Sequence, residues 1–416
     1  MPTSEPRRPA MVGTRHRHEL LKIFRSALHR VAGETAVSRW LSRDGNRADF
    51  SAVVAIGKAA PAMMLGARER LETGNLPGLV ITRHGHADPR LDAIPGVLQI
   101  ESGHPVPDET SLEAGQQLLD FLAAAPPDRP VLFLLSGGTS SLVESLPRER
   151  TLSDLRRLNE WLLSSGLDIR AMNRLRSRMS RIKAGQLCSC LEGRPATVLL
   201  ISDVPGDDPA FVGSGLLHPP SFGSVPAELP AAVAGLLNSD PLPMGPPCAD
   251  HHLVAVNADA VAAAMARARQ LGYQAYAVAD SLQGDAAAAG RAFARYLQQA
   301  PAGIHVMGGE TTVRLPASPG RGGRNQHLAL AAAGEIEGRK DILILAAGTD
   351  GSDGRSEDAG ALVDGDTWQR ARDAGLDPRL SLREADSGNL LEATGDLVHT
   401  GPTGTNVMDL LIGLRL

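Results

Sequence analysis

The sequence is poor in aromatic side chains, which make up 3% of its 416 residues. Its cores must therefore be built from Ala, Leu, Val and Ile, and a hydrophobic fraction of 43% is enough for that. The chain also lacks an aromatic platform on which nucleic acid bases could stack. Its net charge of −5 is spread over residues of both signs, with no basic block. We expect no nucleic acid partner.

Long apolar runs are missing as well. The chain contains no run of 18 apolar residues, the length needed to span a bilayer, so we expect no membrane partner. The first 17 residues are polar and lack the apolar segment of a secretory signal. Cysteine is sparse and odd in number (Cys188, Cys190 and Cys248), which favours a reducing compartment. We predict a cytoplasmic location, and we disfavour a zinc site at Cys188 and Cys190 because zinc normally needs four ligands.

Lysine is the scarcest charged residue. The chain has four, Lys22, Lys58, Lys183 and Lys340, against many arginines. A bias in base composition explains this scarcity. A lysine kept under such a bias is nevertheless a slightly better candidate for a role that arginine cannot fill.

What the sequence does contain is a repeated pattern of short apolar runs, most of which end in loops of Gly, Asp and Ser. The runs cover residues 53–56, 79–82, 131–135, 198–201, 253–256, 304–307 and 342–346. Strand, polar loop and helix in repetition indicate an α/β fold with largely parallel sheets, in which ligands bind at the carboxyl ends of the strands.

Chain length favours two domains, and the Pro-rich stretch from residue 219 to 247 is the best linker candidate. We predict a disordered lead over residues 1–14, an N-terminal α/β domain over 15–240 and a C-terminal α/β domain over 241–416.

One loop could hold phosphate. Ser136-Gly137-Gly138-Thr139-Ser140-Ser141 follows a buried run and precedes a predicted helix. Glycines let the backbone approach an anion, although a tight turn with a Ser helix cap explains the pattern equally well. The chain has neither a P-loop motif nor the G-x-G-x-x-G fingerprint, so a P-loop NTPase and a standard dinucleotide site are both unsupported.

Carboxylates gather at two of the predicted strand ends. Asp203, Asp207 and Asp208 form one group, and Asp350 and Asp353 form the other. Beside an anion site, such groups suit Mg²⁺, which prefers one or two carboxylates together with phosphate oxygens. Capping of helices by Asp is the alternative for each loop.

Two cations are candidates for chemistry. Lys58 ends the first predicted strand, where it could neutralise a transferring phosphoryl group or be a solvated turn residue. Arg324 lies in Gly322-Gly323-Arg324-Asn325-Gln326, where it could bind a carboxylate bidentately or belong to a basic surface turn. The loop of residues 401–406 could be purely structural, because Thr and Asn bond well to their own backbone.

Taken in order, these loops resemble the class II glycerate kinases, the family with a C-terminal MOFRL domain, some of whose members are labelled hydroxypyruvate reductase. The resemblance runs from about Arg15 to the C-terminus. It is carried by Ala55-Ile56-Gly57-Lys58-Ala59-Ala60, Gly103-His104-Pro105-Val106-Pro107-Asp108, Leu135-Ser136-Gly137-Gly138, residues 201–208, residues 322–326, Gly348-Thr349-Asp350-Gly351 with Asp353-Gly354, and residues 400–407.

The resemblance implies ATP- and Mg²⁺-dependent phosphorylation of D-glycerate to 2-phosphoglycerate. It also implies two α/β/α domains with an active-site cleft between them. Lys58 and Arg324 match residues regarded as essential in the family, and we expect Asp203 to be a third catalytic residue that orients the attacking hydroxyl.

The remaining site residues are predicted in three groups. We expect ATP to be bound by Ser136, Gly137, Gly138, Thr139, Ser140, Thr403, Gly404 and Asn406. We expect the acid to be bound by Arg324, His104 and Asp350. We expect Mg²⁺ near Asp203, Asp207 or Asp350.

The chain departs from the family's pattern at several positions. Ser177, Arg178, Leu216, Leu217 and His327 replace the usual residues, and Glu357 stands for an Asp. These departures leave three alternatives to a glycerate kinase: a kinase for a related small hydroxy acid, an NAD(P)H-dependent hydroxypyruvate reductase, and a non-catalytic metabolite sensor. The partners we expect are small molecules, with the chain a monomer or a homodimer.

Overall fold

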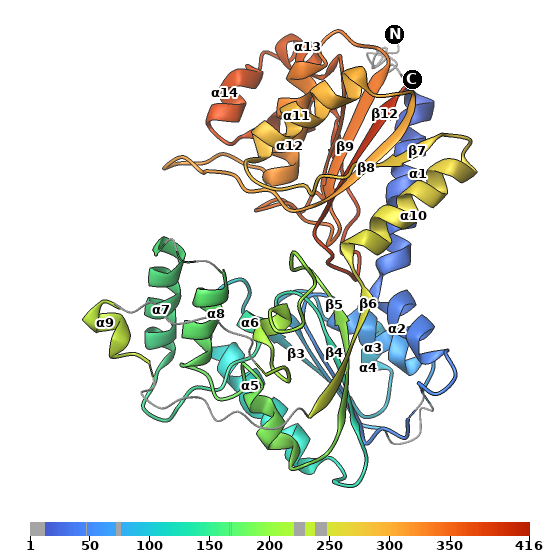
Figure 1. Cartoon of the computed structure of the whole chain (residues 1–416). Helices are drawn as coiled ribbons and strands as arrows, with labels where there is room; N and C mark the ends of the chain where they lie inside the picture. The colour runs from blue at the N-terminus through green and yellow to red at the C-terminus, as the bar shows by residue number, and fades with distance from the viewer. Residues whose placement is uncertain are drawn as a thin grey trace, which may run out of the picture. The chain divides into compact units, whose positions relative to one another are not determined.

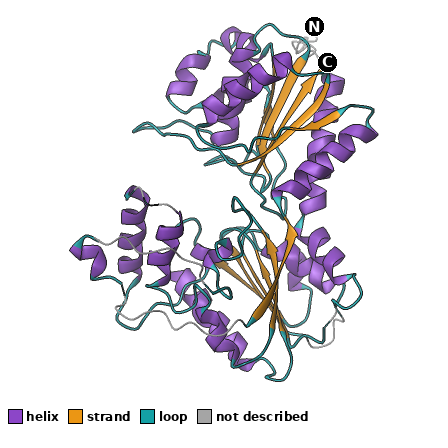
Figure 2. Ribbon diagram, viewed as in Figure 1, coloured by secondary structure: helices purple, strands orange, loops and turns teal. Residues whose placement is uncertain are grey.

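The computed structural model describes residues 13–46, 48–71, 76–165, 167, 169–219, 229–237 and 248–416. The predicted lead over residues 1–14 falls almost wholly outside these residues, as does the predicted domain boundary at residues 240 and 241. The described chain is α/β, as predicted, and divides into two compact units (Figures 1 and 2). None of its helices is both long and apolar enough to cross a bilayer.

We call the first the parallel-sheet unit. It comprises Arg30–Val256 and Gly404–Val407. Its sheet has the order β3-β2-β1-β4-β5-β6, and every pairing is parallel. The strands are β1 (Ala52–Ile56), β2 (Gly78–Arg83), β3 (Val97–Ser102), β4 (Val131–Leu135), β5 (Ala196–Ile201) and β6 (Ala249–Ala255).

Helices cover both faces of this sheet (Figure 1). The helices are α2 (Gly33–Leu41), α3 (Ala60–Arg68), α4 (Pro89–Asp92), α5 (Glu109–Ala124), α6 (Thr139–Leu142), α7 (Leu152–Ser164), α8 (Ile169–Ser177) and α9 (Ala231–Ala234), with 3₁₀ turns η1 (Gln186–Leu191) and η2 (Val212–Ser214). Helix α5 packs Leu118 and Leu122 against strand residues such as Phe133. Because β1, β2, β4 and β5 are buried on both faces, they read as continuous apolar runs, which made them predictable, whereas the edge strands β3 and β6 are partly exposed.

We call the second the mixed-sheet unit. It comprises the described residues up to His29, together with Asn257–Thr403 and Met408–Leu416. Its sheet has the order β11-β10-β9-β12-β8-β7. The strands are β7 (Ala275–Ala277), β8 (Gly303–Gly309), β9 (Ile342–Gly348), β10 (Gly360–Asp364), β11 (Leu397–Val398) and β12 (Asp409–Arg415).

The pairings of this second sheet correct the expectation of largely parallel sheets. Four of its five pairings are antiparallel, and only β7 with β8 is parallel. Parallel neighbours need a long crossover, usually a helix. The loop at 349–359 between β9 and β10 contains no helix, so the chain turns straight back, and β12 inserts antiparallel between β8 and β9.

Helices lie on both faces of the mixed sheet (Figure 1). They are α1 (Thr14–Val31), whose last residues enter the other unit, α10 (Asn257–Gln270), α11 (Ala286–Gln299), α12 (Arg324–Glu335), α13 (Thr367–Asp373), α14 (Pro378–Arg383) and α15 (Ser387–Thr394). Helices α11 and α12 bury Phe293, Leu297 and Leu328 against the sheet in the core of this unit.

Helix α1 is tied to the mixed-sheet unit by charge. The guanidinium of Arg17 donates to Asp364 Oδ2 and to Asp396 Oδ1, each at 2.7 Å. Arg370 bonds the same two carboxylates at 2.9 and 2.8 Å. Sequence patterns gave no sign that residues near the start of the chain belong with residues 257–403.

A disulfide joins Cys188 in η1 to Cys248, just before β6. The two residues are 60 positions apart, and spacing alone did not indicate the pairing. Cys190 remains a thiol.

Candidate active site

The loops after β1 and β4 lie at the topological switch point of the parallel sheet. To one side the strand order runs from β1 to β3, and to the other from β4 to β6. At such a point the crossover connections leave in opposite directions, and ligands bind beside the carboxyl ends of the strands. Lys58 follows β1 and Ser136 follows β4, and the backbone N–H of Lys58 donates to Gly137 O at 2.9 Å.

Two glycines allow this close approach. A Cβ on Gly57, whose φ is 130°, would lie 2.2 Å from Ser136 Oγ. A Cβ on Gly137 would lie 1.8 Å from Asp203 Oδ2. No side chain fits at either place, so the loops after β1, β4 and β5 meet only because these positions are glycine.

Asp203 is held by a residue from far along the chain. Asn406 Nδ2 donates to Asp203 Oδ2 at 2.9 Å. The loop that carries Asn406 is anchored in the same unit, because Thr405 Oγ1 donates to Val31 O at 2.7 Å and Gly33 N donates to Gly404 O at 2.9 Å. The predicted nucleotide residues Gly404 and Asn406 therefore lie in the parallel-sheet unit, whereas Thr403 belongs to the mixed-sheet unit.

The loop of residues 136–141 differs from its prediction in one respect. Its second half, from Thr139, already belongs to α6, which is a single turn of four residues. The Thr139 hydroxyl is buried and donates to Ile56 O and Ser136 O, so it fixes the turn. Ser140 Oγ lies 2.8 Å from Ser214 Oγ. His104 lies beside this loop: a Cβ on Gly138 would be 3.1 Å from His104 Nε2 and 3.3 Å from Lys58 Cγ.

The acidic loop after β5 has one unsatisfied carboxylate oxygen. Asp207 Oδ1 is buried without a hydrogen-bond partner, whereas Asp208 Oδ1 accepts from Ala210 N at 3.0 Å. A buried carboxylate oxygen without a donor is costly, unless a cation or another group satisfies it. Asp203 and Asp207 lie in one loop, and two carboxylates suit Mg²⁺ that also binds phosphate oxygens. The residues therefore fit the ion, although no group of three His, Cys, Asp or Glu among the described residues could hold a metal alone.

The second cluster lies in the mixed-sheet unit around Arg324, the first residue of α12. Arg324 Nε donates to Asp409 Oδ2 at 2.6 Å, and Nη2 donates to Asp409 Oδ1 at 2.9 Å. Its Nη1 forms an ion pair with Glu310 at 2.9 Å. Burial alone would lower the pKa of Arg324, but the hydrogen bonds and charge of Asp409, with Glu310, raise it.

Asp353 caps the helix that carries Arg324. Its carboxylate accepts from Asn325 N at 3.1 Å and from Gln326 N at 2.8 Å. Burial raises the pKa of Asp353 to about 7, against the lowering effect of these backbone donors. Asp350 instead forms a local turn, accepting from Ser352 N and Ser352 Oγ at 3.1 Å.

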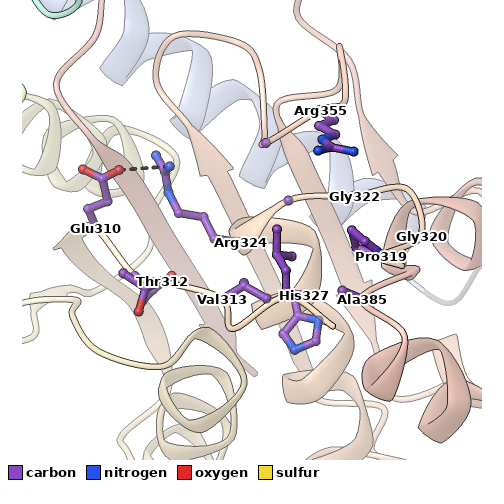
Figure 3. Close-up of a pocket in the computed structure, with 14 residues that line it drawn as sticks. Glu310, Thr312, Val313, Pro319, Gly320, Gly322, Arg324, His327, Arg355 and Ala385 are labelled. Carbon is purple, nitrogen blue, oxygen red and sulfur yellow. Dashed lines mark ion pairs between the residues drawn. The ribbon is translucent and has the colours of Figure 1, made fainter. Parts of the chain in front are cut away.

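A pocket of about 360 Å³ opens beside this cluster. Figure 3 shows the Arg324 side chain directed to Glu310, while His327, from the same helix, points the other way. His327 Nδ1 lies 3.3 Å from Ser387 Oγ, and burial lowers the pKa of this imidazole. The apolar lining includes Val313 and Leu315.

The structure thus assigns the predicted site residues to two clusters. Lys58, His104, Ser136–Ser140, Asp203, Asp207, Gly404 and Asn406 belong to the parallel-sheet unit, and Arg324, Asp350 and Thr403 belong to the mixed-sheet unit. Sequence reasoning missed Asp409 and Glu310, the partners of Arg324. The available signal was weak: an acidic residue opens the apolar run that becomes β12.

The departures at Ser177, Leu216 and Leu217 are buried, and both leucines lie in the core of the parallel-sheet unit. His327, in contrast, lines the pocket beside Arg324. Of these four positions, His327 is the one that can reach a ligand in that pocket.

Two family models match the chain. Residues 19–227 match the family described as Domain of unknown function (DUF4147), and residues 303–409 match the MOFRL family.

Curated relatives and a solved structure extend over most of the chain. A D-glycerate 2-kinase of Thermotoga maritima is 34% identical, covering 95% of this chain and 97% of its own. A protein of Agrobacterium vitis that bears the name of a hydroxypyruvate reductase is 39% identical, covering 86% and 85%. The crystal structure of a glycerate kinase from Thermotoga maritima superposes with a TM-score of 0.84 at 32% identity, covering 97% of this chain and all of that one.

Proposed function

The chain belongs to the glycerate 2-kinase family with a MOFRL domain, and we propose that it transfers a phosphoryl group from ATP to D-glycerate, giving 2-phosphoglycerate. The observation that supports this best is the cluster at the switch point of the parallel sheet. There Lys58, the Ser136–Ser140 loop and the Asp203–Asn406 pair meet at the carboxyl ends of β1, β4 and β5.

The roles we propose follow from charge and position. The glycine loop, with Ser136, Ser140 and Asn406, binds the phosphates of ATP, and Lys58 offsets the charge of the transferring group. Asp203, oriented by Asn406, accepts a hydrogen bond from the hydroxyl of the acid. Asp203 and Asp207 would hold Mg²⁺, which when bound screens phosphate charge. Asp350 stays a proposed ligand of Mg²⁺; it lies in the mixed-sheet unit, where its carboxylate accepts from Ser352 N.

Arg324 is the proposed receptor for the carboxylate of the acid, because a guanidinium binds a carboxylate through two parallel hydrogen bonds. Asp409 and Glu310 already bond the group and fix its orientation. We keep His104 as a proposed contact of the acid, since it lies by Gly138 and Lys58.

A kinase for a related, larger hydroxy acid is the second candidate. The pocket beside Arg324, about 360 Å³, lies within the range of sites for drug-sized ligands, which is more room than a three-carbon acid requires. His327, the departure that lines this pocket, could contact additional groups of such an acid.

A reductase is less well supported, although one relative carries that name. The strand order is the one found in dinucleotide-binding sheets. However, the loop after β1 reads Gly57-Lys58-Ala59-Ala60-Pro61, with one glycine where the fingerprint needs three. A shared sheet order does not decide function, which depends on the site.

One assay separates the candidates. ADP release is coupled to a detectable signal with glycerate, tartronate, hydroxypyruvate and a larger sugar acid in turn, and the phosphorylated product is identified by NMR. Faster ADP release with the sugar acid than with glycerate would indicate the second candidate. We expect ADP release with glycerate and phosphate on the 2-hydroxyl. NAD(P)H oxidation with hydroxypyruvate would indicate a reductase instead, and tight ligand binding without turnover would indicate a sensor.

The proposed location is cytoplasmic, and the proposed assembly is a monomer or a homodimer. The Cys188–Cys248 disulfide weighs against a reducing compartment, because such compartments keep thiols reduced. Thiol titration of protein purified under alkylating conditions tests the location, and sedimentation tests the assembly.

A further inference from the structure

A buried ion pair in the parallel-sheet unit has no role in the proposed reaction. Lys183 Nζ lies 2.5 Å from Glu144 Oε2, and the two side chains are 3% and 0% exposed. The other carboxylate oxygen of Glu144 accepts from Ser180 Oγ at 2.6 Å and from Ser145 N at 2.9 Å. Lys183 is one of four lysines in the chain.

Stability is a weak explanation for such a pair. Removing two charges from water costs about as much as their attraction returns, and well-packed apolar side chains often replace a buried pair without loss. What the pair does is join two segments. Glu144 follows the loop of residues 136–142, and Lys183 begins the turn that leads into η1.

From Lys183, hydrogen bonds lead back to the same loop. Ala184 N donates to Ser214 O at 3.0 Å, and Gly185 N donates to Gly215 O at 2.7 Å. Ser214 Oγ then lies 2.8 Å from Ser140 Oγ. The contacts therefore form a closed circuit from Glu144 through Lys183 and Ser214 to Ser140.

Two residues of this circuit have strained backbones. Ala184 has a φ of 55° and Ser214 a φ of 57°, in the left-handed region that residues with a Cβ seldom occupy. Such conformations persist only where the surroundings enforce them, and they gather at functional sites. Because Ala184 bonds directly to Ser214, the ion pair next to Ala184 helps to enforce both.

We propose that Lys183, paired with Glu144, is a positioning residue that sets the Ser140 hydroxyl for the phosphates of the nucleotide. The inference rests on the proposed function, in which the Ser136–Ser140 loop binds ATP. Lys183 is buried, so it acts on the nucleotide through Ser214 and Ser140 and not by direct contact.

The test replaces both members of the ion pair by neutral residues, so that no buried charge is left without its partner. In Glu144→Gln/Lys183→Met, the glutamine oxygen still accepts from Ser180 and Ser145, and the methionine replaces the lysine stem. Thermal unfolding confirms that the variant folds, and calorimetry measures binding of a non-hydrolysable ATP analogue with Mg²⁺. We expect affinity to fall by about 10- to 100-fold, the range for a misplaced hydrogen bond to a charged group, with KM for glycerate unchanged.

Further variants locate the effect. Ser140→Ala should weaken analogue binding by a similar factor, and combining it with the neutral pair should add little, since both act on one hydroxyl. Ser214→Ala breaks the circuit without touching the ion pair, so it remains informative if the neutral pair does not fold. Lys183→Arg, which keeps the charge, should recover part of the affinity. The matched control neutralises an exposed ion pair, in Glu109→Gln/Arg156→Met, and should leave the affinity for the analogue unchanged.

Three results would overturn the inference. If the folded neutral-pair variant binds the ATP analogue with wild-type affinity, Lys183 has a purely structural role. If that variant does not fold, wild-type affinity in Ser214→Ala leads to the same conclusion. If the affinity losses of the neutral pair and of Ser140→Ala multiply in the combined variant, the ion pair acts on a group other than the Ser140 hydroxyl. If Ser140→Ala itself binds normally, the assignment of the nucleotide loop fails as well, and this outcome distinguishes the two failures.

Discussion

The two clusters are held in place by different forces. At the switch point of the parallel sheet, short loops bond backbone to backbone, and glycines let them touch. In the mixed-sheet unit, buried carboxylates hold Arg324 and the start of its helix. Geometry that depends on the backbone should tolerate changes of charge, whereas geometry that depends on charge should not. Substitutions in the two clusters can therefore test whether this difference is real.

The largest effect should come from Lys58→Ala. Losing the charge beside the transferring phosphoryl group should lower kcat by about 10³-fold or more, the scale of comparable groups in phosphoryl transfer. The backbone contact of residue 58 remains, so thermal unfolding should be unchanged. Lys22→Ala, at an exposed lysine of α1, is the control. A Lys58→Ala variant that keeps most of its turnover would remove Lys58 from the mechanism.

Arg324→Lys should have the next largest effect. An ammonium cannot reproduce the two parallel bonds to a carboxylate, so KM for the acid should rise by about 10- to 100-fold. The KM for ATP should stay within about twofold, since Arg324 is assigned to the acid and not to the nucleotide. Steady-state kinetics with each substrate varied in turn measures both. A rise in the KM for ATP alone would reverse the assignment of the two clusters.

Asp409→Asn should destabilise the protein where Glu310→Gln does not. Asp409 is fully buried, whereas Glu310 is 39% exposed, and both pair with Arg324. Losing a buried partner costs about 3–5 kcal/mol, and Arg324 is partly exposed, so we expect about 2 kcal/mol. Exposed partners contribute under about 1 kcal/mol. Urea unfolding measures the free energy of unfolding of both variants. Equal losses of stability would contradict the view that charge holds this cluster in place.

The remaining predictions concern how the stability of the protein depends on pH. The pKa of Asp353 is about 7 in the folded chain, above its ordinary 3.8, because burial disfavours the ionised form. Its contribution to stability is therefore full below pH 3.8 and is lost as pH rises toward 7. Relative to Asp353→Asn, the wild-type free energy of unfolding should fall across this range. Parallel curves for the two proteins would show that Asp353 does not titrate there.

For Asp108, in the parallel-sheet unit, we expect the opposite dependence of stability on pH. Burial alone would raise its pKa, but hydrogen bonds from Thr110, His84 and Ser111 lower it to about 2. Its contribution is present above about pH 4 and is lost as pH falls toward 2. Asp108→Asn should therefore flatten the acid limb of the stability profile and leave the range from pH 4 to 7 unaffected.

The sequence predicted the parallel-sheet cluster better than the mixed-sheet cluster, for a physical reason. Buried parallel strands are continuous apolar runs, and their loops meet at one edge, so Lys58, Ser136 and Asp203 could be grouped from the pattern alone. The partner of Arg324 is Asp409, which comes from an antiparallel strand inserted between two others. No local pattern encodes that insertion.

The same reason explains other features that sequence patterns missed. No pattern marked the break at Ala32 between α1 and α2. The ion pairs of Arg17 and the disulfide of Cys188 each join residues far apart in sequence. Periodicity predicts elements, and it does not predict which distant elements meet.

The position of β12 bears on how the protein is made. Translation proceeds from the N-terminus, so Arg17 is synthesised 347 residues before its partner Asp364, about 20–70 s at ordinary rates. Strands β8 and β9 must also wait for β12, which lies between them. Until it leaves the ribosome, both expose open edges to other nascent chains. The open edges of β8 and β9 should therefore need protection from the time β9 emerges until β12 does.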